Sequence, residues 1–600
     1  MPAPHDEYGA RLTARRGTHD RLTSVDARLS YLRLAAFAAA GVVLVAAWRG
    51  VLPWGWLALP ILAFAWLVRA HDRVIAARDM AARAVLFYER GLARLADEWS
   101  ASGETGEQFA DPSHPYAADL DLFGRGSLFQ LLSIARTRVG ERRLADWLLA
   151  PASPAQARAR QAAITELTPL LDLREEVALA GVDVRAAVEA PPLIAWAEHA
   201  PLLRQQWLRI AAAVLTAAVI AAAVVWARSD TASYFVIVIL VELALFMPQR
   251  LRMQQILHAG SGWSRDLDVL AHVLDRLERE RFASPQLSAL RARLDAAGAP
   301  PGTAIRRLHR LVEMHDWQHN LLFAIVATPL LWDVHIAFAM EAWRARYGAH
   351  VRTWLESVGE FEALSSLATY RFEHPGDPFA EIDEQAPAAS FAGVALGHPL
   401  LPAARMIRND VALGNGTQLF VISGSNMSGK STLLRTVGIN AVLALAGAPV
   451  RAASLRLTPL TLGATLRIQD SLQEGRSRFY AEITRIRELA DLADQRAGGG
   501  APLLFLLDEL FHGTNSHDRL LGAAGVLRQL LERGAIGLIT THDLALTAVA
   551  DQLAPRAVNV HFEDRFESGQ ILFDYRMKPG PVTRSNAIAL MRAVGLDVGE

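Results

Sequence analysis

One stretch of the chain constrains the fold more than any other. Between Gln418 and Leu445, an apolar run of strand character is followed by a glycine-containing loop and then by a helix. The loop has the spacing G-x4-G-K-S, in the strand–loop–helix context that this pattern requires to bind phosphate. Its glycines let backbone amides point inward, and the start of the helix favours negative charge. The sequence therefore predicts an α/β domain with a nucleotide held by Gly424, Ser425, Asn426, Met427, Ser428, Gly429, Lys430, Ser431 and Thr432.

The composition draws attention to Lys430. Of 61 basic residues only Lys430 and Lys578 are lysines, a bias that a GC-rich genome would explain. Under such a bias, a lysine is expected to survive where arginine cannot serve, as where a compact ammonium reaches the β- and γ-phosphates. The next residue, Ser431, offers a hydroxyl to Mg²⁺. The sequence assigns no role to Lys578.

Two further apolar strands end in residues that suit ATP hydrolysis. One ends at Asp508 and Glu509, and the other ends just before His542. We expect Asp508 to join the Mg²⁺ shell and Glu509 to be the base that orients the attacking water. His542 is placed to hydrogen-bond a γ-phosphate. The predicted cofactors are ATP and Mg²⁺, and the predicted catalytic residues are Glu509, His542 and Lys430.

Several segments resemble the MutS family of DNA mismatch-repair ATPases. The resemblance is specific over about 386–600 and weaker over 118–205 and 251–385. It is carried by residues 120–151, 398–410, 424–435, 469–489, 508–518, 540–547 and 578–596.

This resemblance implies an ATP site shared between the two subunits of a homodimer. Asn515 and Ser516 would reach across to the partner's γ-phosphate. Tyr575 would present its ring to adenine, and Met406 and Ile407 would pack on the other face. Asn426 and Met427 stand at the family's own loop positions.

The chain also departs from the family pattern. Ser425 and Ser428 stand where the family has proline and glycine, and His512 stands where the family has arginine. The family reads mismatches with a Phe-x-Glu in a mixed α/β domain, and no such domain precedes the core here. The letters recur at Phe87-Tyr88-Glu89, but in a helical stretch where we expect Phe87 to be packed and Glu89 solvated.

Four apolar runs form two close pairs: Leu34–Trp48 with Val51–Val68, and Ile210–Ala227 with Tyr234–Met247. At 1.5 Å per residue, each run alone is borderline for a hydrocarbon core about 30 Å thick. Buried core helices are the alternative, and Glu242 is costly in lipid. The pairing and the aromatic ends favour two transmembrane hairpins, so membrane lipid is an expected partner.

Arginines flank both pairs, whereas each tip carries only one, Arg49 in a predicted Arg49-Gly50 turn and Arg228. By the positive-inside rule, the large segments should lie in the cytoplasm, at the inner (cytoplasmic) membrane. No cleavable signal is evident, and a cytosolic protein is the alternative. We interpret the run Leu321–Leu331, which contains Pro329, as core.

The expected fold class is α + α/β: an all-helical core or lever region with two hydrophobic hairpins, followed by a P-loop ATPase domain with a mainly parallel sheet. The expected order is an N-terminal cytoplasmic helix (1–30), a first transmembrane hairpin (31–69), a helix and linker (70–117), the first segment of a MutS-like helical core (118–205), a second transmembrane hairpin (206–250), the second segment of the helical core or lever (251–385) and the MutS-type ATPase domain (386–600).

Two functions stay open. The resemblance implies an ATPase that closes a dimer in DNA binding, mismatch repair or related DNA handling. The alternative is a membrane-embedded ATPase machine that moves its hairpins and does not bind DNA. The net charge of −1 excludes a protein-wide basic surface, and residues 251–385 carry 14 Arg against 18 Asp and Glu.

A transporter subunit is less well supported, because no L-S-G-G-Q signature occurs. The absence of cysteine excludes disulfides and thiolate chemistry.

Overall fold

The structure is a computed structural model that describes residues 3–180, 190–203, 205–229, 231–260, 263–295, 298–425, 427–467, 478–494, 500–511, 516–567 and 570–582. Helices occupy the chain up to residue 373, and strands follow. The helices of the N-terminal region are α1 (Pro4–Trp48), α2 (Ala58–Leu95), α3 (Leu128–Leu132), α4 (Arg138–Leu149), α5 (Pro154–Leu167), α6 (Leu171–Leu179), α7 (Ala190–Glu198), α8 (Gln206–Ser229), α9 (Ser233–Phe246), α10 (Arg250–Gly260), α11 (Ser264–Arg279), α12 (Pro285–Asp295), α13 (Pro301–Asp316), α14 (Leu321–Ala327) and α15 (Trp332–Glu373).

The C-terminal region is an α/β region with two mixed sheets. Its elements are β1 (Glu381–Ile382), β2 (Phe391–Leu396), β3 (Asn409–Leu413), β4 (Leu419–Ser423), α16 (Lys430–Ala446), β5 (Ser454–Leu457), β6 (Thr461–Thr465), α17 (Arg478–Asp494), β7 (Leu503–Asp508), α18 (Ser516–Glu532), β8 (Ile536–Thr541), α19 (Ala548–Gln552), β9 (Ala557–Glu567) and β10 (Gln570–Pro579). A helical region followed by an α/β region is the predicted order.

The larger sheet places the site. Its strand order is β10-β9-β4-β8-β7-β6, with β10 antiparallel to β9 and the other neighbours parallel. Strand β8 lies between β4 and β7, so the loops after these three strands meet at one edge. The smaller sheet has the order β1-β5-β2-β3. Its strand β1 lies within 251–385, which was expected to be helical core or lever, and it pairs in parallel with β5.

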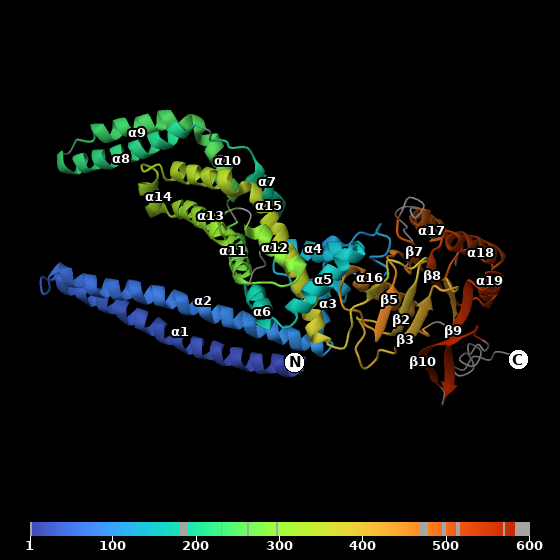
Figure 1. The fold of residues 1–600 in the computed structure, drawn as a ribbon. Coiled ribbons are helices and arrows are strands. Elements are labelled where there is room, and N and C mark those ends of the chain that lie inside the picture. The colour runs from blue at the N-terminus through green and yellow to red at the C-terminus, as the bar shows by residue number, and fades with distance from the viewer. Residues whose placement is uncertain are drawn as a thin grey trace.

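Two helical hairpins extend from the helical core, in the direction opposite to the α/β region (Figure 1). One hairpin is α1 with α2, and the other is α8 with α9. The 42-residue helix α15 runs from the neighbourhood of the second hairpin to the edge of the α/β region. Helix α15 packs against α4, α5, α7 and α13, so it is the central element of the helical core.

Buried polar contacts tie the base of the first hairpin to the end of α15. The Tyr8 hydroxyl of α1 donates to the Glu373 carboxylate at 3.1 Å, and Arg94 of α2 donates to both oxygens of that carboxylate at 2.6–3.0 Å. Gly91 allows this approach, since a Cβ there would lie 2.6 Å from the Tyr8 ring. The hairpin therefore docks where α15 enters the α/β region.

A layer of polar residues links α1 to α2, between the base of the first hairpin and its apolar end. The buried His71 ring contacts Arg33 at 2.7 Å and also contacts Asp26, and Arg78 pairs with Asp26 at 2.7 Å. Beyond this layer the hairpin carries exposed apolar side chains up to the turn at Arg49-Gly50, where Gly50 has φ of 74°.

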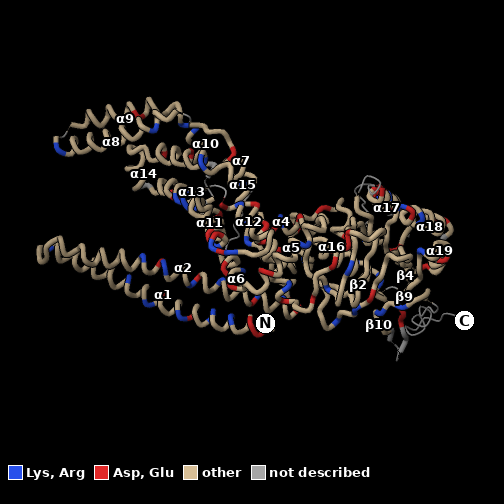
Figure 2. Tube along the Cα trace, viewed as in Figure 1, with Lys and Arg blue, Asp and Glu red and all other residues tan. Residues whose placement is uncertain are grey.

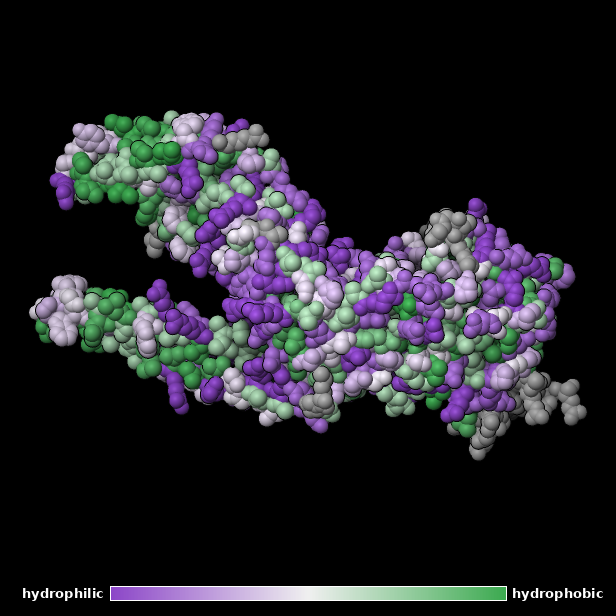
Figure 3. Space-filling model, in the orientation of Figure 1, coloured by the Kyte–Doolittle hydropathy of each residue, from purple (hydrophilic) through white to green (hydrophobic). Residues whose placement is uncertain are grey.

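Among the described residues, three helical stretches are long and apolar enough to cross a membrane: Pro4–Trp48, Gln206–Ser229 and Ser233–His258. Charged residues are sparse along the outer parts of both hairpins (Figure 2). The same parts are the most hydrophobic areas of the visible surface (Figure 3). Length and composition therefore agree with the sequence interpretation for three of the four apolar runs.

The remaining apolar run, Val51–Val68, does not form one helix. It begins with a turn and the 3-10 helix Trp54–Leu57, and α2 starts only at Ala58. Pro53 explains the break, because proline cannot continue a helix from the preceding residues. The 11 helical residues from Ala58 to Val68 extend about 16 Å, which is less than a hydrocarbon core.

The interpretation of Leu321–Leu331 as core is wrong for some of its residues. Ala327 and Leu331 are buried, but Ile325 and Val326 of α14 are exposed. Helix α14 lies on the same side of the molecule as the α8–α9 hairpin (Figure 1). These exposed residues therefore extend the apolar surface of that end of the molecule.

Candidate nucleotide site

The loop between β4 and α16 bends sharply around the start of the helix. Gly424 has φ of 153°, Met427 of 66° and Gly429 of 103°, which are values that glycine tolerates far better than other residues. The Lys430 ammonium donates to the backbone oxygens of Gly424 and Ser425, each at 2.8 Å. Burial lowers the pKa of Lys430, and the carboxylates of Asp508 and Glu509 partly offset this effect. The side chain of Lys430 therefore spans the loop.

Asp508 lies directly beside the start of α16. One of its oxygens accepts a hydrogen bond from the Ser431 hydroxyl at 2.6 Å, and the other accepts one from the Thr540 hydroxyl. The register explains this contact, because Asp508 pairs with Thr540 across β7 and β8. Thr540 was not predicted from the sequence, although it immediately precedes the Thr-His pair at the end of β8.

Glu509 and His542 meet at the same edge of the sheet. A Glu509 carboxylate oxygen lies 3.3 Å from His542 Nδ1, and both side chains are partly exposed. Glu509 has φ of 50°, and its backbone N–H donates to Thr540 at 3.2 Å. The structure thus brings together five of the predicted residues: Lys430, Ser431, Asp508, Glu509 and His542.

The two serines that depart from the family pattern have buried hydroxyls. Ser425 Oγ and Ser428 Oγ have no hydrogen-bond partner among the described residues. Ser428 is 1% exposed, and its hydroxyl lies 2.9 Å from the position a Cβ would take on Gly424. An unpartnered buried hydroxyl is costly, so these two groups are suited to a polar ligand held in the loop. The last loop residue, Thr432, lies in the first turn of α16.

Tyr575 approaches the same loop from β10. A Cβ on Gly429 would lie 3.0 Å from the Tyr575 ring, so the ring rests against the loop backbone. Asn409 of β3 holds the segment, because its side chain donates to Tyr575 O at 3.0 Å and accepts from Met577 N at 2.8 Å. Tyr575 is 42% exposed, and its φ of 51° falls at a register shift in β10.

Ile407, two residues before Asn409, is 41% exposed, and Met427 is 84% exposed. Met406 packs on Gly397 instead, where a Cβ would lie 2.3 Å from its sulfur. Met427 of the loop and Ile407 are therefore exposed apolar groups, whereas Met406 is turned toward the small sheet.

Some predicted residues lie outside the described residues. These are Asn426, His512 and Asn515. Ser516 is described only as the first residue of α18. Lys578 lies on the β9–β10 hairpin, opposite His561, which in turn pairs with Ser423 at the end of β4. Its ammonium pairs with Glu563 at 2.5 Å and Asp574 at 2.9 Å. Hydrogen bonds to these carboxylates raise the pKa of Lys578.

The helix that follows the loop also contacts the helical region of the chain. Arg435 of α16 donates to Asp119 O at 3.1 Å and lies 3.6 Å from the Asp121 carboxylate. One turn further, Gly438 lies so close to Leu120 that a Cβ would be 2.5 Å from its side chain. Residues 119–121 therefore rest directly on α16, one helical turn beyond the loop.

Comparisons with known proteins place this region. Residues 420–598 match the sequence model of MutS domain V. The chain therefore contains a region similar to MutS domain V, as the sequence predicted. It is 35% identical over 206 residues to "DNA mismatch repair protein MutS 2" of Haloarcula marismortui, and 34% identical over 200 residues to "Endonuclease MutS2" of Thermus thermophilus. These stretches are 34% and 33% of this chain and 21% and 25% of those relatives.

A longer match reaches into the helical region. "DNA mismatch repair protein MutS" of Sorangium cellulosum is 30% identical over 331 residues, which are 53% of this chain and 31% of that relative. The chain thus spans between about a fifth and a third of the MutS-family relatives it matches.

The Phe-x-Glu letters of the MutS family lie on α2, in a part of the chain where the described residues form helices and no strand. Phe87 packs edge-on against Tyr88, with ring centroids 5.1 Å apart. Glu89 pairs with Arg16 of α1 at 2.7 Å. Both expectations are met, because Phe87 is partly buried and Glu89 is exposed beside Arg16.

Proposed function

We propose that this chain is a MutS-type ATPase that binds and hydrolyses ATP with Mg²⁺, works as a homodimer and couples hydrolysis to the handling of DNA. The observation that carries the proposal is that Lys430, Ser431, Asp508, Glu509 and His542 gather at one sheet edge, within the region that matches MutS domain V. The relatives' names supply DNA mismatch repair.

The residues of the loop fit a Mg²⁺–nucleotide. Mg²⁺ takes oxygen ligands, and Ser431 with Asp508 presents two oxygens 2.6 Å apart beside the loop. When bound, the metal neutralises charge on the phosphates. Lys430 would hold the phosphates, and the buried hydroxyls of Ser425 and Ser428 would gain acceptors in them.

Glu509 is the proposed base that orients the attacking water, because its carboxylate is partly exposed and is held beside His542. His542 would bond the terminal phosphate from the neighbouring strand end. Ile407 and Tyr575 would flank the adenine. From the partner subunit, Asn515 and Ser516 would complete the site.

Replacing Glu509→Gln tests the assignment of the base. We expect ATP binding to persist while turnover falls by at least about a hundredfold, because the water loses the carboxylate that orients it. Single-turnover and steady-state ATPase assays on the full-length protein measure both. Glu532→Gln, an exposed carboxylate at the end of α18, is the matched control. Turnover by Glu509→Gln at the wild-type rate would show that the base is another residue.

A second candidate function is a membrane-embedded ATPase that moves its hairpins and does not bind DNA. It is favoured by the three helical stretches that are long and apolar enough to span a bilayer. The relatives' names concern DNA, so this candidate rests on the helices alone.

DNA binding distinguishes the two functions. If the chain handles DNA, the detergent-solubilised protein should bind duplex, mismatched or branched DNA with an affinity that falls linearly with salt on a double-logarithmic plot. Titrations at several salt concentrations, with and without a non-hydrolysable ATP analogue, provide the measurement. No binding at low salt in either nucleotide state would favour the membrane machine.

A further inference from the structure

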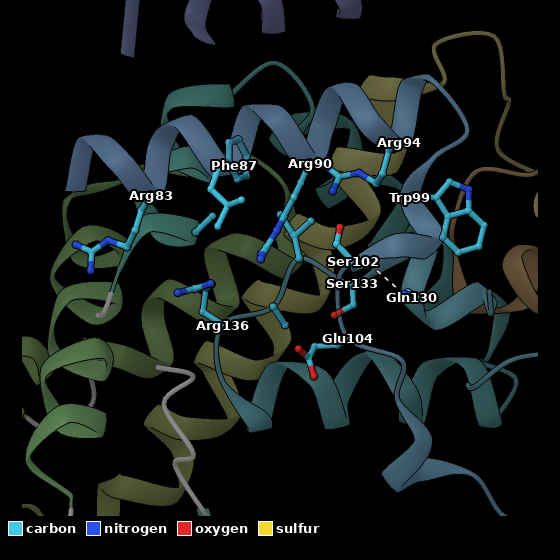
Figure 4. Close-up of a pocket in the computed structure, with 15 residues that line it drawn as sticks. Arg83, Phe87, Arg90, Arg94, Trp99, Ser102, Glu104, Gln130, Ser133 and Arg136 are labelled. Atoms are coloured by element: carbon cyan, nitrogen blue, oxygen red, sulfur yellow. Dashed lines mark hydrogen bonds between the residues drawn. The ribbon is translucent and has the colours of Figure 1, made fainter. Parts of the chain in front are cut away.

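A second cavity lies outside the nucleotide site, where the first hairpin meets the helical core. Its volume is about 330 Å³. Helix α2 forms one wall, the turn between α3 and α4 forms the opposite wall, and residues 99–104 close one end (Figure 4). A cavity of this size is at the lower end of the range for small-molecule sites.

The walls are strongly cationic. Arg83, Arg90 and Arg94 line the cavity from α2, and Arg136 lines it from the opposite wall. Glu104 is the one carboxylate among the lining residues that the structure describes. Because Arg94 is held by Glu373, Arg83 faces Asp268 and Arg136 lies near the carboxylate of Glu362, the surplus positive charge is centred on Arg90.

Among these arginines, Arg90 gives the strongest indication of an anion site. Its side chain is exposed at the edge of the cavity, and its guanidinium has no hydrogen-bond or ion-pair partner among the described residues. Burial lowers the pKa of Arg90, and the positive charges of Arg136 and Arg94 lower it further. Three arginines held near one another repel, so an anion between them would relieve the repulsion.

A hydroxyl on the opposite wall is also unsatisfied. Ser133 Oγ is buried and has no hydrogen-bond partner within the described ranges. By contrast, Gln130 is engaged, since its amide donates to Ser102 O at 3.0 Å and accepts from Gly126 N at 2.7 Å. Beside these polar groups, Leu86, Phe87 and Ile134 supply an apolar wall.

We propose that this cavity binds a small soluble organic phosphate, with the phosphate between Arg90, Arg136 and Ser133 and the carbon body against Phe87. Arginine presents a fork of donors that matches phosphate oxygens, and the Ser133 hydroxyl adds a neutral donor. Because the walls belong to α2 and to the core, the bound ligand would fasten the first hairpin to the core.

The position of the cavity argues against a lipid headgroup as the source of the phosphate. The apolar run of the hairpin ends at Val68, and α2 continues without a break to Arg83 and Arg90. At 1.5 Å per residue these arginines lie about 22 and 33 Å further along the helix. A soluble ligand can reach a cavity this far from the apolar run. The headgroup of a lipid in a bilayer around that run cannot.

The test uses full-length protein carrying Lys430→Ala, so that the nucleotide loop does not contribute, and AMP as the probe. Calorimetric titration should give a dissociation constant below about 1 mM, and AMP should raise the melting temperature by mass action. Arg90→Gln should weaken binding at least about tenfold, because charged hydrogen bonds to the phosphate are lost. Ser133→Ala should weaken it several-fold.

Arg73→Gln is the matched control, an exposed arginine on the same helix outside the cavity. It should leave AMP binding unchanged, and circular dichroism checks the folding of every variant. AMP binding that Arg90→Gln does not weaken would overturn the proposal. An absence of AMP binding would also overturn it. In that case, binding to phosphatidylglycerol nanodiscs in preference to phosphatidylcholine nanodiscs, lost in Arg90→Gln, would show that the phosphate comes from lipid.

Discussion

Asp508 shows how a single carboxylate organises the candidate site. It accepts from Ser431 on one oxygen and from Thr540 on the other, so its plane is held between α16 and β8. A carboxylate held by two hydroxyls keeps its orientation before a cation arrives, which is how outer partners support metal ligands. Thr540 is buried, so no water competes for this contact.

Thr540→Val should therefore weaken the response to Mg²⁺. Valine keeps the shape of threonine but removes the hydroxyl, so Asp508 loses one donor and the neighbouring Glu509 N–H loses one acceptor. We expect the Mg²⁺ concentration for half-maximal ATPase activity to rise several-fold, and stability to fall by about 1–3 kcal/mol. Thr541→Val is the control, since the Thr541 hydroxyl donates to Asp543 O instead. An unchanged Mg²⁺ dependence would mean that Asp508 needs no such support.

The site residues differ in how far the sequence reveals them. The loop pattern and the strand ends predicted that Lys430, Asp508 and Glu509 would meet, because parallel strands end at one edge. Thr540 was missed because its role depends on the register between β7 and β8. The contact of Tyr575 with Gly429 likewise requires a bulge in β10 that no local pattern announces.

At the scale of elements, α16 connects the candidate site to the rest of the molecule. It begins at Lys430 and packs against α4 and α5 of the helical core as well as against the large sheet. Gly438 makes this approach possible, because a Cβ there would lie 2.5 Å from Leu120 and 2.7 Å from Leu506. A movement of the loop that shifts α16 would therefore also shift the helices of the core that contact it.

Gly438→Ala tests how tightly α16 is packed. Alanine favours helices by up to about 1 kcal/mol over glycine, but here its methyl group must displace two leucine side chains. We expect a net loss of about 1–3 kcal/mol, seen as a lower melting temperature of the detergent-solubilised protein. Gly525→Ala on α18 is the matched control, because nothing lies within 4 Å of its Cβ position, and it should be neutral or stabilising. A stabilised Gly438→Ala variant would show that the contact is loose.

The helices themselves were predictable to different degrees. The sequence predicted a helical region with two hairpins up to residue 385, and the structure ends the last of these helices, α15, at Glu373. Pro53 is a sequence signal from which the break in Val51–Val68 was predictable. The exposure of Ile325 and Val326 was not predictable, because it depends on where α14 sits relative to helices distant in sequence.

At the scale of the whole molecule, both hairpins point the same way and the α/β region lies at the other end (Figure 1). The apolar runs predicted two hairpins but not their common direction. That direction follows from long-range docking, in which Tyr8 and Arg94 meet Glu373 more than 270 residues away in sequence. This arrangement allows one flat bilayer to hold both apolar ends with the candidate ATP site outside it.

Cysteine labelling tests this arrangement, because the chain has no cysteine of its own. If both hairpins span the membrane, Arg49→Cys and Arg228→Cys should react with an impermeant maleimide added from the non-cytoplasmic side. Ala388→Cys, an exposed position next to the α/β region, should react only after the membrane is opened. The protein should also stay with membranes in high salt, since salt screens surface charge but not apolar burial.

The two hairpins can give different results. Because Val51–Val68 is interrupted at Pro53, the first hairpin offers one long apolar helix and a shorter return, whereas the second offers two apolar helices. We therefore expect labelling of Arg228→Cys to be at least as complete as labelling of Arg49→Cys. Labelling of Arg228→Cys only after lysis would show that α8 and α9 pack against protein instead. The membrane machine would then lose its main support, and the DNA-handling function would gain ground.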